Sequence, residues 1–521
     1  MTRPVKRGTL SVALAAVVVE AGCLLLWALS PRLTSIYNAE FSAAYFARVP
    51  AAEALAQHTL AILGPLGEPA ADPLGMVVPL MACLGLMTAG YAGGLLALHL
   101  SRGLATWPVI SGAFAFRVTL WLLPGLFSTD IFSYVMYGRI AAAHAGNPYV
   151  QPPADFASDP FLGWVFPFWR DQPSVYGAGW TDVSWLLSAL TAGLDNFGQV
   201  SAYRGALVGA DVVTLLALWW LLGRLRPAER LRSFLLFAWN PLILFDISGN
   251  AHNDGPMLAL LLLGFAPLTS TAEPSGRRWL AAIGTSVLGS LVKYASGLTS
   301  LMMTIAFAAR AARWPERLKR LAMAAVVSLA FTLLFWWPWL RGPEGLAAIG
   351  DAAGGRLVLN SAPDLVATFA AERLQLAPAE ARLWMRGLAR GAFGLYLLWE
   401  AWRLWRAARW GGRVALLATI RASARAMLLL PLLVLTWVWS WYFSWSLALV
   451  ALLGWRSGLT WLVVAYTLVV LPIVYAHQYL ADQLPAVLIL VMAAGPASVA
   501  FARCAVRGVF GSRRVAVELR A

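Results

Sequence analysis

Long, uninterrupted apolar segments are the feature that most restricts how this chain can fold. Thr9–Leu29, Gly75–Leu100 and Leu484–Arg503 are each as long as a membrane-crossing helix, which needs roughly 20 apolar residues. Only 12% of the 521 residues are charged, against about 25% in soluble proteins. The chain therefore has too few charges to coat several soluble domains. The sequence predicts an all-α polytopic membrane protein and argues against the soluble, disordered and fibrous classes.

The net charge of +15 has a source that involves no nucleic acid. Cytoplasmic loops of membrane proteins collect Lys and Arg, so a basic balance is expected in this class. The three cysteines, Cys23, Cys83 and Cys504, lie within or at the end of apolar segments and show no disulfide or metal spacing. The N-terminal segment is longer than the hydrophobic region of a signal peptide, and we interpret it as an uncleaved first span.

The apolar pattern predicts about 12–14 spans, of which the short ones could be re-entrant. They lie at 9–29, 75–100, 106–126, 202–223, 232–249, 256–270, 279–292, 295–310, 321–340, 384–404, 422–438, 443–455, 459–475 and 485–503. With both termini cytoplasmic, most Lys and Arg fall in cytoplasmic segments and most acids in external loops, as the positive-inside bias requires. The long loops 30–74, 127–201 and 341–383 are then external, and residues 1–521 form one integral membrane domain.

The start of the second external loop carries the first candidate functional acid. Asp130 follows the third span directly. Ser128 or Thr129 can cap a following helix, which would place Tyr134 and Tyr137 one to two turns from the carboxylate. The alternative is an acid favoured at a helix start by the helix dipole.

Two further polar stretches fall on the same predicted side. Tyr176 lies in an aromatic segment broken by Gly and Pro, Trp169–Trp180, which suits contact with a sugar ring; the alternative is a belt of aromatic residues at the membrane interface. A turn after the fifth span carries His252, Asn253 and Asp254, more polarity than a hairpin needs. A hydrated turn is the alternative there.

Ionisable residues inside apolar segments are costly in lipid and often functional. Lys293 interrupts one such segment and is a candidate site residue, unless its side chain snorkels to the surface. Glu20, Arg117 and Asp211 sit in the middle of predicted spans and could pair within the bundle.

An arginine stripe begins the predicted span at 384–404. Arg386 and Arg390 lie on one helical face that enters the membrane from outside. Arginines on that side call for an anionic partner, and a phosphate at headgroup depth would supply it. Arg204 could contribute to the same site. The alternative is pairing with loop carboxylates such as Glu380 or Asp364.

The chain resembles the polyprenol-phosphate-mannose-dependent α-1,6-mannosyltransferases of actinobacterial lipoglycan assembly, which belong to the GT-C class of membrane glycosyltransferases. The matching stretches are Leu126–Arg139, Gly146–Tyr149, Trp169–Trp180, Asn240–Asp254, Leu291–Tyr294 and Trp441–Trp445. The resemblance implies a GT-C-like helix bundle with external loop helices in a bacterial cytoplasmic membrane. It also implies a polyprenyl-phosphate sugar donor, a glycan or glycolipid acceptor and an extracytoplasmic active site.

In that class an acid early in an external loop is the general base, and Asp130 occupies this place. The simplest members carry the acid in the first external loop, whereas here it opens the second, so an extra N-terminal hairpin must be assumed. If Glu40 or Glu53 in the first loop were the base, the Asp130 assignment would fail.

The predicted chemistry is inverting transfer of a sugar, most simply mannose, from lipid phosphate to an acceptor hydroxyl that Asp130 deprotonates. The leaving phosphate would be held by Lys293, Arg386, Arg390 and Arg204. Sugar hydroxyls would be oriented by Tyr134, Tyr176, His252, Asn253 and Asp254. No cofactor is required, although Asp130 with Asp254 could hold one divalent ion.

Other functions remain open from the sequence. Within the enzyme interpretation, an arabinofuranosyl- or glucosyltransferase is the nearest alternative. A transporter or flippase of lipid-linked glycans should show paired repeats and polarity at mid-membrane, whereas the polarity here lies mostly near one surface.

Overall fold

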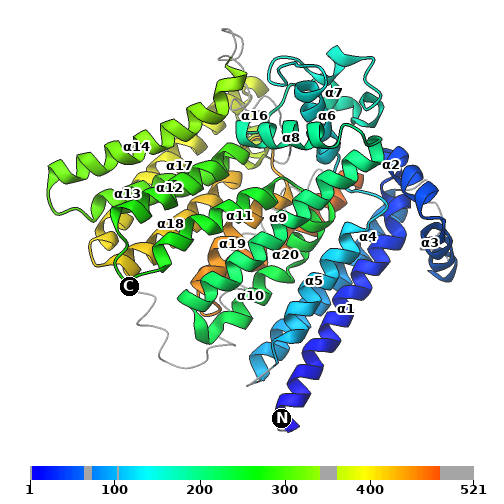
Figure 1. Cartoon of the computed structure of the whole chain (residues 1–521), viewed down its shortest axis with the longest axis horizontal. Coiled ribbons are helices and arrows are strands. Elements are labelled where there is room, and N and C mark those ends of the chain that lie inside the picture. Colours follow the sequence, from blue (N-terminus) through cyan, green and yellow to red (C-terminus); the bar gives the residue numbers. More distant parts are fainter. Residues whose placement is uncertain (1–2, 64–72, 102–104, 341–358, 360, 481–521) are drawn as a thin grey trace.

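A computed structural model describes residues 3–63, 73–101, 105–340, 359 and 361–480 (Figure 1). The described part is helical, apart from one isolated parallel bridge between Leu359 and Trp437. Its α-helices are α1 (Arg3–Leu33), α2 (Ser35–Arg48), α3 (Pro50–Leu63), α4 (Pro73–Leu100), α5 (Trp107–Trp121), α6 (Asp130–Ala142), α7 (Pro167–Arg170), α8 (Ala178–Leu190), α9 (Asn196–Leu225), α10 (Arg230–Ala238), α11 (Asp254–Phe265), α12 (Gly276–Val292), α13 (Gly297–Ala309), α14 (Trp314–Trp336), α16 (Ala362–Leu374), α17 (Pro378–Ala408), α18 (Gly412–Leu433), α19 (Phe443–Leu453) and α20 (Gly458–Leu480).

Short π- and 3₁₀-helices complete the described helical structure. One π-helix, η5 (Ile243–Gly249), follows α10. The 3₁₀ segments are η2 (Pro153–Phe156), η3 (Leu162–Trp164), η4 (Pro227–Glu229), η6 (Ala266–Thr269), η7 (Tyr294–Ser296), η8 (Trp337–Trp339) and η9 (Ser440–Tyr442).

The prediction of an all-α polytopic membrane protein is confirmed. Six described helices are long and apolar enough to cross a membrane: α1, α4, α9, α14 with η8, α18 and α20. A seventh would be the pair 227–238 and 243–249, which is bent by 66°. Several predicted spans instead form apolar helices too short to pass this test, among them α5, α11, α13 and α19. The predicted span at 485–503 lies outside the described residues.

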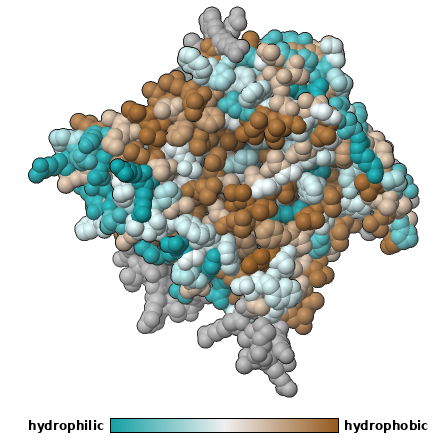
Figure 2. Space-filling view, in the orientation of Figure 1, coloured by the Kyte–Doolittle hydropathy of each residue, from teal (hydrophilic) through white to brown (hydrophobic). Residues whose placement is uncertain are grey.

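The long helices run side by side through the bundle (Figure 1). α1, α4 and α5 form one flank of the bundle and α12, α13, α14 and α17 the other, while α6, α7 and α8 of the 127–201 loop cover one end. Apolar residues form a broad band across the face shown in Figure 2, with hydrophilic residues mainly at the periphery. On α14 the side chains of Val326, Leu329 and Leu333 are exposed, as expected for a surface that faces lipid tails.

Polar contacts fix the 127–201 loop to the bundle. The side chain of Asn38 on α2 donates to Leu126 O at 2.6 Å and accepts from Leu126 N at 3.1 Å, which holds the segment leading into α6. Farther along the loop, buried Asp159 accepts from Arg139 Nε at 3.0 Å and contacts His144 Nε2 at 2.7 Å. The loop is therefore a folded layer, and its first residues have a defined position over the bundle.

Ionisable residues in the middle of the bundle are paired, as the sequence predicts. Arg117 Nε lies 2.8 Å from Asp211 Oδ2, and both side chains are buried. Ser248 Oγ donates to the same Asp211 oxygen at 2.6 Å, and Thr119 donates to Glu20. Cys23 and Cys83 are free and buried, and Cys504 lies outside the described residues.

Candidate active site

The candidate catalytic acid stands at the first residue of α6. Asp130 N donates to Ser128 Oγ at 3.3 Å, whereas Thr129 makes no side-chain cap. One helical turn later, Tyr134 OH lies 3.4 Å from Asp130 Oδ2. The Asp130 side chain is 15% exposed, so its carboxylate is packed into the protein and still open to a ligand.

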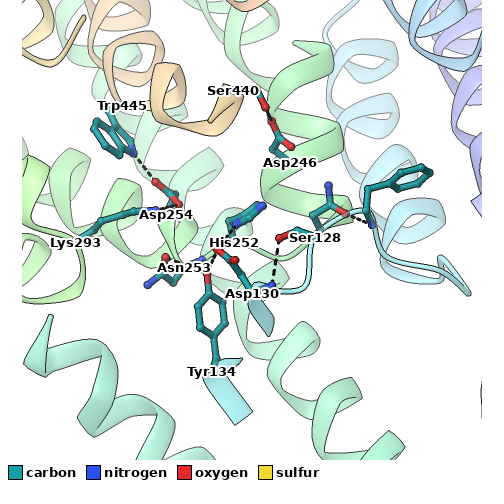
Figure 3. Close-up of polar contacts among 12 residues, drawn as sticks. Ser128, Asp130, Tyr134, Asp246, His252, Asn253, Asp254, Lys293, Ser440 and Trp445 are labelled. Atoms are coloured by element: carbon teal, nitrogen blue, oxygen red, sulfur yellow. Dashed lines mark hydrogen bonds and ion pairs between the residues drawn. The ribbon is translucent and has the colours of Figure 1, made fainter. Parts of the chain in front are cut away.

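The 250–254 turn between η5 and α11 meets this acid from the other side of the site. His252 Nδ1 lies 3.4 Å from Asp130 Oδ2. Asn253 Oδ1 accepts from Tyr134 OH at 3.2 Å, and Asn253 N donates to the same hydroxyl at 3.3 Å. Figure 3 shows these four side chains converging from α6 and the turn. We call Asp130, Tyr134, His252 and Asn253 the acid cluster.

The turn takes an unusual backbone path to reach this position. Ala251 has φ of 55°, in the left-handed region that residues other than glycine rarely adopt. Strained residues of this kind persist where surrounding contacts hold them, often at functional sites. The conformation sets His252 and Asn253 toward the acid and starts α11 at Asp254.

A buried ion pair adjoins the acid cluster. Lys293 Nζ donates to Asp254 Oδ2 at 2.6 Å, and Trp445 Nε1 donates to Oδ1 of the same carboxylate (Figure 3). The ammonium also lies over the ring of Tyr442, 4.8 Å from its centroid. Lys293 thus turns into the bundle, which favours a site role over snorkelling.

Aromatic side chains line this region on two sides. The His252 ring stacks on Trp441 at 3.8 Å between centroids, and Trp441 stacks on Trp439 at 4.9 Å. On the opposite side Tyr176 packs edge-on against Tyr134 at 4.9 Å. Burial, followed by the charge of Asp130, raises the pKa of Tyr176 well above its usual value, so this phenol remains a donor. Flat faces beside fixed polar atoms suit the binding of a sugar ring.

Several buried polar atoms near the turn have no hydrogen-bond partner within the described part of the chain. They are both ring nitrogens of His252, Asn253 Nδ2, Trp441 Nε1 and Ser444 Oγ. Buried polar groups are normally satisfied, so a group of unsatisfied ones points to a polar ligand.

A second buried carboxylate, Asp246 on η5, was not selected from the sequence. Ser440 Oγ and Tyr475 OH each donate to it at 2.8 Å, and Asn250 Nδ2 donates to Tyr475 OH at 3.3 Å. The sequence signal that could identify Asp246 is an acid inside the apolar stretch Leu242–Ile247. Its hydrogen bonds tie η5 to η9 and α20 behind the 250–254 turn.

The three predicted phosphate-binding arginines do not join this group through any contact between described residues. Arg386 is bound to Asp364, with Nη2–Oδ1 at 2.7 Å and Nε–Oδ1 at 3.0 Å, so the alternative of a loop carboxylate holds for it. Arg204 donates to Leu123 O and Leu120 O, each at 3.0 Å. Arg204 therefore satisfies carbonyls at the end of α5, and Arg390 is exposed on α17.

The other sequence alternatives can be placed as well. Glu40 and Glu53 are exposed on α2 and α3. No group of three or more metal-ligating side chains occurs among the residues that the structure describes. The oxygens of Asp254 are already bound by Lys293 and Trp445, so an ion shared by Asp130 and Asp254 would have to displace these donors.

A known family and several curated proteins resemble parts of this chain. A family model described as alpha-(1->6)-mannopyranosyltransferase, N-terminal domain, matches residues 41–312. Alpha-(1->6)-mannopyranosyltransferase B of Corynebacterium glutamicum is 28% identical over 261 residues, covering 45% of this chain and 42% of that protein. An alpha-(1->6)-mannopyranosyltransferase of Mycobacterium tuberculosis is 30% identical over 178 residues, covering 31% of this chain and 29% of that protein.

A probable alpha-(1->6)-mannopyranosyltransferase of Mycolicibacterium smegmatis is 27% identical over 288 residues, covering 46% of this chain and 50% of that protein. The matches thus span half or less of the length of these curated relatives, and no solved structure matches the chain significantly. The family model covers more than half of the 521 residues and includes Asp130, the 250–254 turn and Lys293. On this evidence the protein belongs to the alpha-(1->6)-mannopyranosyltransferase family.

Proposed function

We propose that this protein transfers mannose from a polyprenyl-phosphate donor to a glycan or glycolipid acceptor, with inversion at the anomeric carbon. The observation that carries the proposal is the acid cluster, in which a partly exposed carboxylate meets unsatisfied buried polar atoms beside stacked aromatic rings. The names of the relatives support mannose over arabinofuranose or glucose.

Asp130 is proposed as the general base. Its carboxylate would accept the proton of the attacking acceptor hydroxyl as the new glycosidic bond forms, a contribution of about 10²–10⁴ in rate. Tyr134 and His252 contact the same oxygen, Oδ2, at 3.4 Å each and would hold the carboxylate in one orientation. Attack from the face opposite the leaving phosphate inverts the anomeric centre.

Lys293 is proposed to stabilise the leaving phosphate. Its position is fixed by Asp254, and its side chain is 15% exposed, so the ammonium is held in place and accessible. A fixed cation beside developing negative charge lowers the barrier without reorganisation. Arg390 remains a predicted phosphate contact, whereas Arg386 and Arg204 already have partners within the protein.

The proposed membrane orientation places the acid cluster outside the cell and both termini in the cytoplasm. The basis is the positive-inside bias of the connecting loops. No sugar nucleotide is available on the outer face, so an activated sugar must arrive there on a lipid. The embedded bundle and the lipid-facing surface of α14 are compatible with such a donor.

The decisive experiment is transfer from synthetic polyprenyl-phosphate mannose by the purified protein, beside the glucose and arabinofuranose donors. Asp130→Asn should lower the mannose transfer rate by about 100-fold or more, because the base is lost. Asp171→Asn, an exposed acid in the same loop, is the matched control and should retain activity. Full activity of the Asp130→Asn variant would exclude Asp130 as the base. Loss of transfer activity in a Glu53→Gln variant would likewise contradict this assignment.

A further inference from the structure

Four arginines converge between α17, α18 and the end of α9. Arg403 lies on α17, Arg421 and Arg425 lie on α18, and Arg226 is the C-cap residue of α9. Arg421 and Arg425 are one turn apart on one face of α18, and Arg413 Nη2 of the same helix donates to Leu225 O, beside Arg226, at 3.2 Å. One carboxylate, Glu400, stands among them, 3.0 Å from Arg425 Nη1 and 3.8 Å from Arg403 Nη1. We call the four arginines, Arg226, Arg403, Arg421 and Arg425, the basic cluster.

The basic cluster carries more positive charge than its carboxylates neutralise. Glu400 pairs mainly with Arg425, and Glu229, which lies near Arg226, is bound by Arg456 Nε at 3.2 Å. No hydrogen bond or ion pair between described residues engages the half-buried Arg421 guanidinium. Arg226 Nε is also buried without a partner there.

The convergence is more than the positive-inside bias requires. That bias places arginines near the cytoplasmic ends of helices, where each can reach water separately. Arg421 and Arg425 lie 9 and 13 residues into α18, about 14 and 20 Å along the helix at 1.5 Å per residue. Like charges gathered between packed helices repel one another. An anionic ligand would remove that cost.

The basic cluster is remote from the acid cluster. Gly255, next to Asp254 at the start of α11, adjoins Leu207 and Asp211 on α9. Arg226 follows Asp211 by 15 residues along the same helix, about 22 Å at 1.5 Å per residue. The two clusters therefore lie at different depths of the bundle, and one ligand headgroup cannot occupy both.

We propose that the basic cluster binds the phosphate headgroup of an anionic lipid in the leaflet opposite the acid cluster. Guanidinium groups bind phosphate oxygens bidentately, and basic pockets between membrane helices are suited to anionic headgroups. Arg421 and Arg226 supply the unpaired donors. The phosphate comes either from a bilayer phospholipid or from a polyprenyl phosphate. The site is independent of the proposed transferase activity.

The test measures lipid binding to purified, delipidated full-length protein by native mass spectrometry and by thermal unfolding. The probes are phosphatidylglycerol, polyprenyl phosphate and zwitterionic phosphatidylcholine. Arg421→Gln should bind the anionic lipids about tenfold or more weakly, because a charged bidentate contact is lost. Arg406→Gln, an exposed arginine that lies over Trp402 at the same end of α17, should bind like the unaltered protein.

A second readout separates lipid binding from misfolding. Without lipid, Arg421→Gln should unfold at the same or a higher temperature than the unaltered protein, because one repelling charge is removed. Anionic lipid should raise the unfolding temperature of the unaltered protein and of Arg406→Gln, and raise that of Arg421→Gln much less. If Arg421→Gln does not fold, Arg421→Lys must still bind more weakly than Arg406→Gln.

The lipid arms identify the source of the phosphate. Stabilisation by phosphatidylglycerol assigns the site to bilayer phospholipid, and stabilisation by polyprenyl phosphate alone assigns it to a polyprenyl lipid. Equal affinity of Arg421→Gln and the unaltered protein for both anionic lipids would overturn the proposal. So would equally tight binding of phosphatidylcholine, or failure of the unaltered protein to bind either anionic lipid.

Discussion

His252 occupies the centre of the candidate site, between Asp130 and the stacked ring of Trp441. Neither ring nitrogen makes a hydrogen bond to a described residue, although Nδ1 lies 3.4 Å from Asp130 Oδ2. The nitrogens are therefore free to bind a ligand beside the acid. His252→Phe keeps a flat ring on Trp441 and removes both nitrogens. We expect it to unfold near the temperature of the unaltered protein and to lose about tenfold or more in transfer rate.

Thermal unfolding and initial-rate assays check this prediction together. His252→Ala is the comparison, because it removes the stacked ring as well and should lower both stability and activity. A fully active His252→Phe protein would show that the ring only fills space.

The Lys293–Asp254 ion pair should contribute measurably to the folding stability of the protein. Removing one partner of a buried pair leaves an uncompensated charge and costs about 3–5 kcal/mol. Lys293→Met should therefore destabilise the protein, because among the described residues the Asp254 carboxylate then keeps only Trp445 as a donor. The double variant Lys293→Met/Asp254→Leu should be less destabilised than the sum of the two single variants.

A double-mutant cycle on thermal unfolding measures this coupling. Additive effects would mean that the two side chains do not stabilise each other. Transfer activity should fall in every member of the cycle, since the ammonium that is proposed to stabilise the leaving phosphate is lost or displaced in each.

At the scale of elements, the stability of the folded 127–201 loop depends on the Asp159 carboxylate. Burial acts to raise the pKa of this carboxyl, but hydrogen bonds from Arg139, His144 and the amide of Phe161 outweigh it and lower the pKa below its usual value. A carboxyl with a lower pKa in the folded state stabilises the fold above its unfolded pKa, about 3.9. That contribution is lost as the pH falls through the lower folded value.

We therefore expect the loop to open locally as the solution is made more acidic than about pH 4. Hydrogen exchange of residues 151–165, followed against pH, checks this. Asp159→Asn should exchange faster at neutral pH and lose the acid dependence, while Asp155→Asn, an exposed acid in the same loop, should behave like the unaltered protein. An unchanged pH dependence in Asp159→Asn would assign the effect to another group.

At the scale of the whole molecule, the orientation in the membrane is open to a direct test. Cysteine introduced at the exposed position Asp171, in the 127–201 loop, should react with a membrane-impermeant thiol reagent added outside intact cells. Cysteine at the exposed position Arg313, before α14, should react only after the cells are opened. Cys23 and Cys83 are buried and should stay silent, and Cys504 is replaced by Ser. The reverse labelling pattern would place the acid cluster in the cytoplasm.

The class of the protein and the local position of most helices could be predicted from the apolar pattern alone. Apolar length is a one-dimensional property, so the predicted spans at 9–29, 75–100 and 459–475 recur as α1, α4 and α20. The sequence also indicates that Arg117 and Asp211 need partners within the bundle, because both lie inside predicted spans, and in the structure they pair with each other. Short helices such as α5 and α19, which the apolar pattern predicts as spans, have fewer than 18 residues and do not reach crossing length by themselves.

Which polar residues meet could not be predicted from the sequence, because it depends on how distant segments pack. Asp130 and His252 are more than 100 positions apart, and their contact depends on the packing of α6 against the 250–254 turn. Arg386 had two possible partners in sequence, a ligand phosphate and a loop carboxylate, and the docking of α16 on α17 brought Asp364 to it. A charge is satisfied by whichever opposite group the fold brings within a few ångströms, and sequence spacing fixes that distance only within one helix.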